Sequence, residues 1–353
     1  MKNILVLFGG CSSEHDVSVV SAASVISHIN REKYNVYMMG ISKEGNWYLY
    51  EGPVDSLPGD KWLVDGKRTK AFVSPDREEH GIVVLREDGA EVIRIDVAFP
   101  VLHGKNGEDG TMQGLFQLAG IPFVGCDMTS SAVSMDKIHT NTICDEWKIP
   151  QARWDFVTRH SYDTGIKTLE SVVRKLGYPI FVKPANAGSS VGISKAHDFE
   201  ELVDAVNLAF LHDSRVLFEE FIDGYEVECS VLGNDEVITG VVGQINPANE
   251  FYDYDAKYND SASTLHIPAL VSEEARNTVA ELAVKTFKAL GCSGFSRVDF
   301  FVRKADNVVL FNEINTIPGF TDISMYPKMI EAAGISYSEL CDRLIELAEE
   351  KWS

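Results

Sequence analysis

Residues 295–315, FSRVDFFVRKADNVVLFNEIN, contain the pattern that decides the fold. Two apolar runs, 295–302 and 308–315, flank the polar turn RKADN, which predicts two strands paired as an antiparallel β-hairpin. The apolar residues around the charged ones favour a place inside a sheet. A solvated edge hairpin with incidental charges is the alternative interpretation.

Four polar side chains of this hairpin are expected to meet on one face. Because side chains alternate across a strand, Arg297 and Asp299 share a face, as do Glu313 and Asn315. If the two faces coincide, carboxylates are buried together, which is unfavourable unless a cation neutralises them. Two carboxylates and an amide suit a hard ion such as Mg²⁺, which also binds the phosphates of substrates.

Length and composition describe a multidomain globular protein. The chain has 353 residues, of which 45% are hydrophobic and 24% are charged, and this length predicts two or three domains. Its 32 basic and 53 acidic residues give a formal net charge of −21. Such a charge disfavours nucleic acid and anionic membranes as partners, although a few placed lysines can still hold a phosphate.

Cysteine usage and hydropathy indicate a cytoplasmic protein. The six cysteines lie far apart without a CxxC pair, so we expect reduced, mostly buried thiols instead of disulfides or a zinc site. The N-terminal KNILVLFGG enters a strand directly, unlike a signal peptide. No apolar run is long enough to span a bilayer.

The order of elements predicts three α/β domains, which comprise residues 1–127, 128–218 and 219–353. The first opens with a strand, the pair Gly9 and Gly10, a helix and a second strand, an order that favours a parallel sheet. The stretch 44–95 is interpreted as irregular decoration of that sheet. Strands over 95–104 and 121–125 follow.

Periodic apolar positions and capping residues predict the helices. Asp198 and Glu201 form the pattern of a capping box at one helix start, and Gly291 follows the end of another helix. The expected helices cover residues 17–29, 111–119, 136–147, 165–176, a segment from 198 onward, 272–290 and 337–350.

Two glycine-rich segments are candidate ligand loops. Gly9 and Gly10 precede a helix N-terminus, where free N–H groups favour an anion or a carboxylate, but GxGxxG is absent. The segment 183–193, KPANAGSSVGI, lies between extended stretches, which excludes a Walker A loop. A mobile loop over nucleotide phosphates is favoured there, with an ordinary β-turn as the alternative.

Three further segments carry candidate contacts. In 219–228, EEFIDGYEVE, the carboxylates can accept from an adenine amino group and a ribose, or form a solvated strand face. The aromatic-rich 251–258, FYDYDAKY, suggests a lid over a site. The turn NTIPGF at 315–320 offers a backbone N–H that can serve as an oxyanion donor.

Taken together, these segments resemble the ATP-grasp superfamily and, more narrowly, the D-alanine–D-alanine ligases. The match runs in family order from residue 9 to residue 327 and covers nearly the whole chain. The matching segments are GGxSxExxVS (9–18), LHGKNGEDGTMQG (102–114), MDK (135–137), KPANAGSSVGI (183–193), EEFIDGYE (219–226), YDYDAKY (252–258), SRVDF (296–300) and NEINTIPGFT (312–321).

The resemblance implies an α/β, three-domain ATP-grasp ligase with an N-terminal parallel α/β domain. ATP is expected between the central and C-terminal domains, with two Mg²⁺ ions, or Mn²⁺ in their place. The residues that match ATP-binding positions are Lys137, Lys183, Ser190, Glu219, Phe221, Ile222, Glu226 and Lys257. The residues that match metal ligands are Asp299, Glu313 and Asn315.

The resemblance also implies a reaction through an acyl phosphate. The carboxylate of a first D-alanine attacks the γ-phosphate of ATP, and the amine of a second D-alanine then attacks the acyl carbon. The residues that match catalytic positions are Glu14, Ser189, Tyr258, Arg297 and Gly319, with Arg297 and the Gly319 N–H stabilising the oxyanion. The residues that match substrate-binding positions are Glu14, His103, Ser324 and Met325.

The second substrate is expected to be D-alanine. Related ligases of glycopeptide-resistant bacteria use D-lactate or D-serine instead. Lys257 and Tyr258 resemble the dipeptide-forming enzymes, and Met325 stands where the resistance-type ligases carry arginine. Stretches such as FPVLHGKNGEDG and ALGCSGFSRVDF resemble the D-serine branch, which keeps a D-alanine–D-serine ligase as the alternative.

Two other functions compete with this interpretation. One is a non-catalytic nucleotide-binding module, which the retained Arg297, metal ligands and Tyr258 disfavour. The other is an ATP-grasp ligase for a different substrate, which Glu14 and Ser324 disfavour. By resemblance, the protein is expected to act in peptidoglycan synthesis as a cytoplasmic homodimer with ATP and D-alanine as its small-molecule partners.

Overall fold

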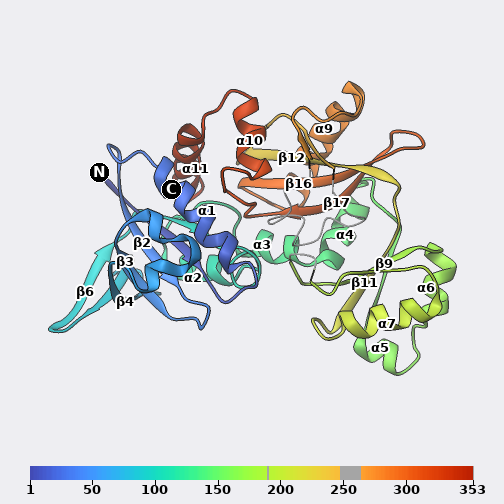
Figure 1. Cartoon of the computed structure of the whole chain (residues 1–353), viewed down its shortest axis with the longest axis horizontal. Helices are drawn as coiled ribbons and strands as arrows, with labels where there is room; N and C mark the ends of the chain where they lie inside the picture. Colours follow the sequence, from blue (N-terminus) through green and yellow to red (C-terminus); the bar gives the residue numbers. More distant parts are fainter. Residues whose placement is uncertain (189–190, 247–263, 353) are drawn as a thin grey trace.

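The computed structural model describes residues 1–188, 191–246 and 264–352. Three sheets with helices packed on them make up the molecule, with the seven-stranded sheet towards one end of its longest axis and the four-stranded sheet towards the other (Figure 1). Strands and helices both occur throughout the described ranges, which confirms the predicted α/β class.

The first sheet contains strands of both directions. Strand β1 pairs in parallel with β2 and β7, as the βαβ start predicts. Its order is β6-β5-β4-β3-β2-β1-β7. The elements are β1 (Lys2–Gly9), α1 (His15–His28), β2 (Tyr34–Ile41), β3 (Trp47–Glu51), two 3₁₀ helices (Val54–Ser56 and Pro58–Leu63), β4 (Lys67–Val73), β5 (Gly81–Arg86), β6 (Gly89–Arg94), β7 (Val97–Val101) and α2 (Thr111–Ala119).

The interpretation of 44–95 as irregular was wrong, whereas the predicted parallel pairing is confirmed for β1 with β2 and β7. This stretch forms β3 to β6, which extend the sheet through antiparallel pairs. Strand β6 is exposed along most of its length and β4 along half of its own, so no apolar alternation marks these strands in the sequence. The expected strand over 121–125 is only a bridge between Ala98 and Phe123, where Pro122 has no N–H to donate.

The second sheet is antiparallel, in the order β10-β9-β11-β8. The Asp198 side chain accepts the Glu201 N–H at 2.9 Å, as predicted, whereas the Glu201 carboxylate accepts the His197 N–H at 2.7 Å. The elements are β8 (Trp154–Thr158), α5 (Arg159–Asp163), α6 (Leu169–Leu176), β9 (Ile180–Pro184), β10 (Ser194–Ala196), α7 (Phe199–Ala209) and β11 (Arg215–Glu220).

The third sheet contains the predicted hairpin. Strands β16 and β17 are antiparallel neighbours, which confirms that prediction. The order is β15-β14-β12-β16-β17, with β13 paired to β12. The elements are β12 (Gly224–Gly233), β13 (Val237–Thr239), β14 (Gly243–Asn246), β15 (Thr264–His266), α9 (Glu273–Ala289), β16 (Gly294–Arg303), β17 (Val309–Asn315), α10 (Met325–Ala332) and α11 (Tyr337–Trp352).

Two helices between the first and second sheets pack on the third. These are α3 (Met128–Met135), which the sequence did not predict, and α4 (Lys137–Glu146). Cys144 of α4 belongs to the same buried cluster as Val298 and Phe311 of the third sheet. The division at residues 127 and 218 therefore stays a prediction. The first and third sheets each fall within one predicted segment, whereas β11 of the second sheet crosses the boundary at 218.

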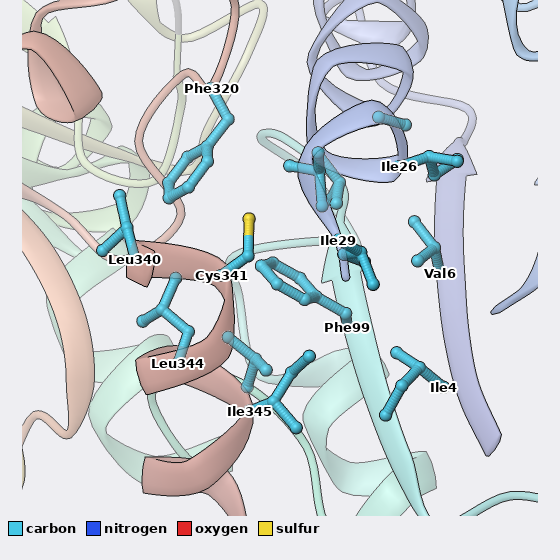
Figure 2. Close-up of a cluster of buried hydrophobic side chains, with 14 of the residues drawn as sticks. Ile4, Val6, Ile26, Ile29, Phe99, Phe320, Leu340, Cys341, Leu344 and Ile345 are labelled. Carbon is cyan, nitrogen blue, oxygen red and sulfur yellow. The ribbon is translucent and has the colours of Figure 1, made fainter. Parts of the chain in front are cut away.

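Helix α11 packs between the third sheet and the first sheet. Figure 2 shows Leu340, Leu344 and Ile345 of α11 facing Ile4 of β1 and Phe99 of β7. Ile26 of α1 and Ile29, which caps the C-terminus of α1, complete this apolar contact. The first and third sheets therefore share one core, which keeps the loops that follow β7 and β17 in a constant relation.

Two further expectations concern the thiols and the membrane. All six cysteines are free, and of these only Cys11 is exposed, which confirms the prediction of reduced, mostly buried thiols. Among the helices in the described ranges, none is long and apolar enough to cross a membrane.

Truncation of a side chain in the shared core tests this packing. Leu344 is 0% exposed, so Leu344→Ala should lower the free energy of unfolding by about 2–5 kcal/mol through lost burial and a cavity. Leu211 is 77% exposed, and Leu211→Ala should change it by no more than about 0.5 kcal/mol. Urea unfolding followed by circular dichroism measures both; equal losses would contradict the packing of α11.

Candidate active site

The strand register brings the charged residues of the hairpin together. Between β16 and β17, Arg297 lies opposite Asn315 and Asp299 lies opposite Glu313. Between β12 and β16, Glu228 lies opposite Asp299. Three carboxylates thus form a row across three neighbouring strands, and the predicted common face is confirmed.

Arg297 is bound within this row. Its Nε and Nη2 atoms donate to the two oxygens of Asp299 at 2.8 and 2.7 Å, and Nε lies 3.2 Å from Oε2 of Glu228. Burial acts against the charged guanidinium, but Asp299, Glu228 and Glu313 raise the pKa of Arg297 well above its ordinary value. The side chain therefore stays cationic in a poorly solvated place.

The same face offers oxygen ligands to a cation. Nδ2 of Asn315 donates to Asp299 at 3.1 Å, so the amide and the carboxylate are in direct contact. Glu313 is the partner of Asp299 across the ladder. Two carboxylates and an amide of this kind fit Mg²⁺, which prefers oxygen ligands and commonly retains positions for phosphate oxygens.

A cavity of about 700 Å³ lies between the second and third sheets. It is bounded by β9 and β11 on one side and by β12, β16 and β17 on the other. Its lining contains most of the residues expected to bind ATP and metal, namely Lys183, Glu219, Phe221, Ile222, Glu226, Asp299 and Glu313.

Two lysines present positive charge at this cavity and beside it. Lys183 Nζ lies 2.5 Å from Glu219 Oε2, and Nδ2 of Asn141 donates to the other oxygen of Glu219 at 3.1 Å. Burial acts against the charged amine, but Glu219 and two other carboxylates raise the pKa of Lys183 above its ordinary value. Lys137 Nζ donates to the Ala187 carbonyl at 2.8 Å, beside the loop that follows β9.

A second cavity, of about 330 Å³, adjoins the first. Arg297, Glu228 and Glu313 line both cavities, so the charged row separates the two spaces. The predicted residues that line the smaller cavity are Glu14, His103, Lys137, Arg297, Glu313, Asn315, Gly319, Ser324 and Met325.

The N–H groups of Gly9 and Gly10 bind atoms of the protein itself, in the turn that leads into α1. The Gly9 N–H donates to the Ser18 hydroxyl at 2.8 Å and the Gly10 N–H to the Ile41 carbonyl at 2.9 Å. Both glycines have φ values in the left-handed region, 88° and 97°, which an L side chain rarely adopts. The loop thereby carries Glu14 to the cavity.

Two other glycines give the Glu14 carboxylate its space. A methyl group at Gly104 would lie 2.3 Å from Glu14 Oε2, and one at Gly188 would lie 2.9 Å from it. Glu14 therefore sits where the loop after β7 meets the loop after β9.

The start of α10 forms the far wall of the smaller cavity. The Ser324 hydroxyl accepts the Thr321 N–H at 3.0 Å and lies 2.7 Å from the Thr321 hydroxyl. Met325 is buried in an apolar cluster with Ile245 and Met329. The wall is thus polar at the helix N-terminus and apolar directly behind it.

Some of the predicted residues are not placed, and some lining residues were not predicted. Ser189, Ser190, Lys257 and Tyr258 lie outside the described residues. Sequence reasoning missed Glu108, Asn141 and Glu228 as separate candidates, although each lies in or beside a motif that was recognised. Glu228 lies two residues after Glu226, so both side chains are expected on the same face of the strand. Only the strand register shows that Glu228 lies opposite Asp299.

Comparison with known proteins agrees with these observations. A model of the D-ala D-ala ligase N-terminus matches residues 3–126, and a model of the D-ala D-ala ligase C-terminus matches residues 143–346. A D-alanine–D-alanine ligase of Acetivibrio thermocellus is 50% identical over 365 residues, which cover 100% of this chain and 97% of that protein.

Solved structures with the same fold include two ligases. The VanG D-Ala:D-Ser ligase from Enterococcus faecalis has a TM-score of 0.90 and 43% identity, covering 98% of this chain and 99% of that one. The D-alanine-D-alanine ligase from Coxiella burnetii has a TM-score of 0.86 and 34% identity, covering 100% and 96%. These matches confirm the predicted ATP-grasp ligase fold, and the chain belongs to the D-alanine–D-alanine ligase family.

Proposed function

We propose that this protein uses ATP to join two D-alanines into D-alanyl-D-alanine, in the cytoplasm and for peptidoglycan synthesis. The observation that carries this proposal is the meeting of two cavities at Arg297, because the reaction needs a nucleotide and an amino acid to share one reacting centre. The proposal includes the homodimer that the family resemblance implies.

ATP is assigned to the larger cavity. Phe221, Ile222, Glu219 and Glu226 lie along the linking segment and strand ends that bound it, where an adenine and a ribose can bind. Lys183 and Lys137 place their charges near the junction of the cavities, which suits the phosphates. Ser190 and Lys257 remain predicted phosphate contacts outside the described residues.

The charged row is assigned to metal binding. Asp299, Glu313 and Asn315 would hold the divalent cation, with two Mg²⁺ ions expected and Mn²⁺ as a substitute. When bound, the cation supplies charge neutralisation for the transferring phosphoryl group.

The smaller cavity is assigned to the two amino acids. Glu14 receives the ammonium group of the first D-alanine, whose carboxylate oxygen bonds to the γ-phosphorus as the bond to ADP breaks. The amine of the second D-alanine then bonds to the acyl carbon and phosphate leaves. Arg297 and the Gly319 N–H stabilise the oxyanion that forms in this step, while Ser189 and Tyr258 are proposed to complete the site.

The second amino acid is assigned to the start of α10. Ser324 and the helix N-terminus favour a carboxylate, and Met325 with Ile245 forms an apolar wall that suits a methyl group. The similarity to a D-Ala:D-Ser ligase keeps D-serine as the second candidate, because a pocket rejects an added hydroxyl only modestly.

The metal assignment is tested by a matched pair of variants in the hairpin. Asp299→Asn should lower ADP formation by about a hundredfold or more, because a charged ligand is lost while Arg297 keeps Glu228 as a partner. Asp306 also binds an arginine through both oxygens, but on the exposed turn of the same hairpin. Asp306→Asn should leave ADP release within about twofold of wild type. Retained turnover in Asp299→Asn would refute the assignment.

The substrate assignment is tested by competition. With ATP and Mg²⁺, D-alanine alone should support ADP release. With equal D-alanine and D-serine, mass spectrometry should find D-alanyl-D-alanine in excess by about tenfold or more. Predominance of D-alanyl-D-serine would establish the second candidate, and a lack of ADP with every substrate pair would favour the non-catalytic nucleotide-binding module.

A further inference from the structure

The segment Thr316–Phe320 links β17 to the smaller cavity and carries the proposed oxyanion donor, the N–H of Gly319. Among the residues that the structure describes, this N–H forms no hydrogen bond. By contrast, the residues on either side of the Pro318–Gly319 turn, Ile317 and Phe320, have both backbone polar groups bound by side chains from other elements.

Ile317 is bound by two side chains of the loop that follows β7. Its N–H donates to Oε1 of Glu108 at 2.9 Å, and the other oxygen of Glu108 accepts the Gly104 N–H at 2.9 Å. His103 Nδ1 lies 2.9 Å from the Ile317 carbonyl. Because a carbonyl only accepts, Nδ1 carries the hydrogen, and Nε2 accepts from the Ser21 hydroxyl at 3.2 Å.

The backbone of Phe320 forms hydrogen bonds with side chains of two helices, α1 and α11. Its N–H donates to the Ser21 hydroxyl of α1 at 3.2 Å, and its carbonyl accepts from the Tyr337 hydroxyl of α11 at 2.5 Å. The Phe320 ring enters the core shared by the first and third sheets (Figure 2). The backbone is therefore held on both sides of Gly319 by hydrogen bonds and by the apolar packing of Ile317 and Phe320.

We infer that Glu108, His103, Ser21 and Tyr337 form a clamp that sets the direction of the Gly319 N–H. These four are positioning residues, and their role rests on the proposed function, which places the oxyanion at this N–H. Glu108, His103 and Ser21 belong to the predicted segment 1–127. The Gly319 N–H belongs to the predicted segment 219–353, so one segment positions a donor of the other. A hydrogen-bond donor that is displaced from an oxyanion loses most of its effect on the rate.

The charges around Glu108 agree with a structural use of its carboxyl group. Burial and the nearby Glu14 raise the pKa of Glu108 to about 8, while the two N–H donors and Arg297 act in the opposite direction. A carboxyl group that is buried beside Glu14 needs nearby hydrogen-bond donors, and the N–H groups of Gly104 and Ile317 supply them. Its two oxygens can still accept the two backbone N–H groups.

Two variants weaken the clamp from opposite sides. Glu108→Gln keeps the shape but leaves one acceptor oxygen for two N–H donors, and Ser21→Ala removes the acceptor of the Phe320 N–H. In each, kcat for dipeptide should fall about tenfold or more while KM for ATP stays within about twofold. ADP released per dipeptide should rise above one, because an acyl phosphate that is attacked slowly is lost to water. Thermal unfolding measures the folded fraction in parallel.

Matched controls use the same chemistry outside the clamp. Asp109, next to Glu108, accepts the N–H groups of Asn106 and Thr111 within its own loop at 2.8 and 3.1 Å. Ser27, on the same helix as Ser21, donates to the Ala23 carbonyl at 2.8 Å. Asp109→Asn and Ser27→Ala should keep kcat within about twofold of wild type and one ADP per dipeptide.

The outcomes separate the clamp from the function on which it rests. Two results overturn the clamp when Arg297→Lys still impairs dipeptide formation. In the first, the clamp variants form dipeptide as fast as their controls do. In the second, the clamp variants lose ADP release and dipeptide formation to the same extent. A wild type that makes no dipeptide, or an Arg297→Lys variant as active as wild type, overturns the site assignment and the clamp with it.

Discussion

The buried guanidinium of Arg297 is held from two adjacent strands, by Asp299 on its own strand and by Glu228 on β12. A buried charge of either sign would be unfavourable alone, and removing one partner leaves the others without compensation. A slip of one residue in the β12–β16 or β16–β17 pairing would turn part of this set to the opposite face. The charges thus specify the register on which both cavities depend.

That register continues into the loop after β17. The strand ends at Asn315, and the chain turns within a few residues to Phe320, whose ring lies in the shared core. Charge therefore places one end of this segment and apolar packing places the other. Arg297 and Gly319 meet at one cavity because these two constraints act on a short length of chain.

Sequence alone located features whose signals are local. The hairpin of 295–315 alternates within one segment, so its shared face could be predicted. Strands β4 and β6 within 44–95 could not, since much of each is exposed and gives no periodic apolar signal. Glu108 was missed because its partner Ile317 lies 209 positions away, and Glu228 because its role depends on which strand lies beside it. Both contacts depend on the order of the strands in the folded sheets, which no local sequence pattern specifies.

Helix α11 covers apolar residues of β1 and β7 although it lies far from both strands in the sequence (Figure 2). A ribosome completes the seven-stranded sheet long before it completes this helix. During synthesis, the surface around Ile4 and Phe99 is therefore open to solvent or to chaperones until α11 has been made and packs against it. The segment Thr316–Phe320 is anchored in that same core, so a nascent chain fixes the position of this segment only when α11 has packed.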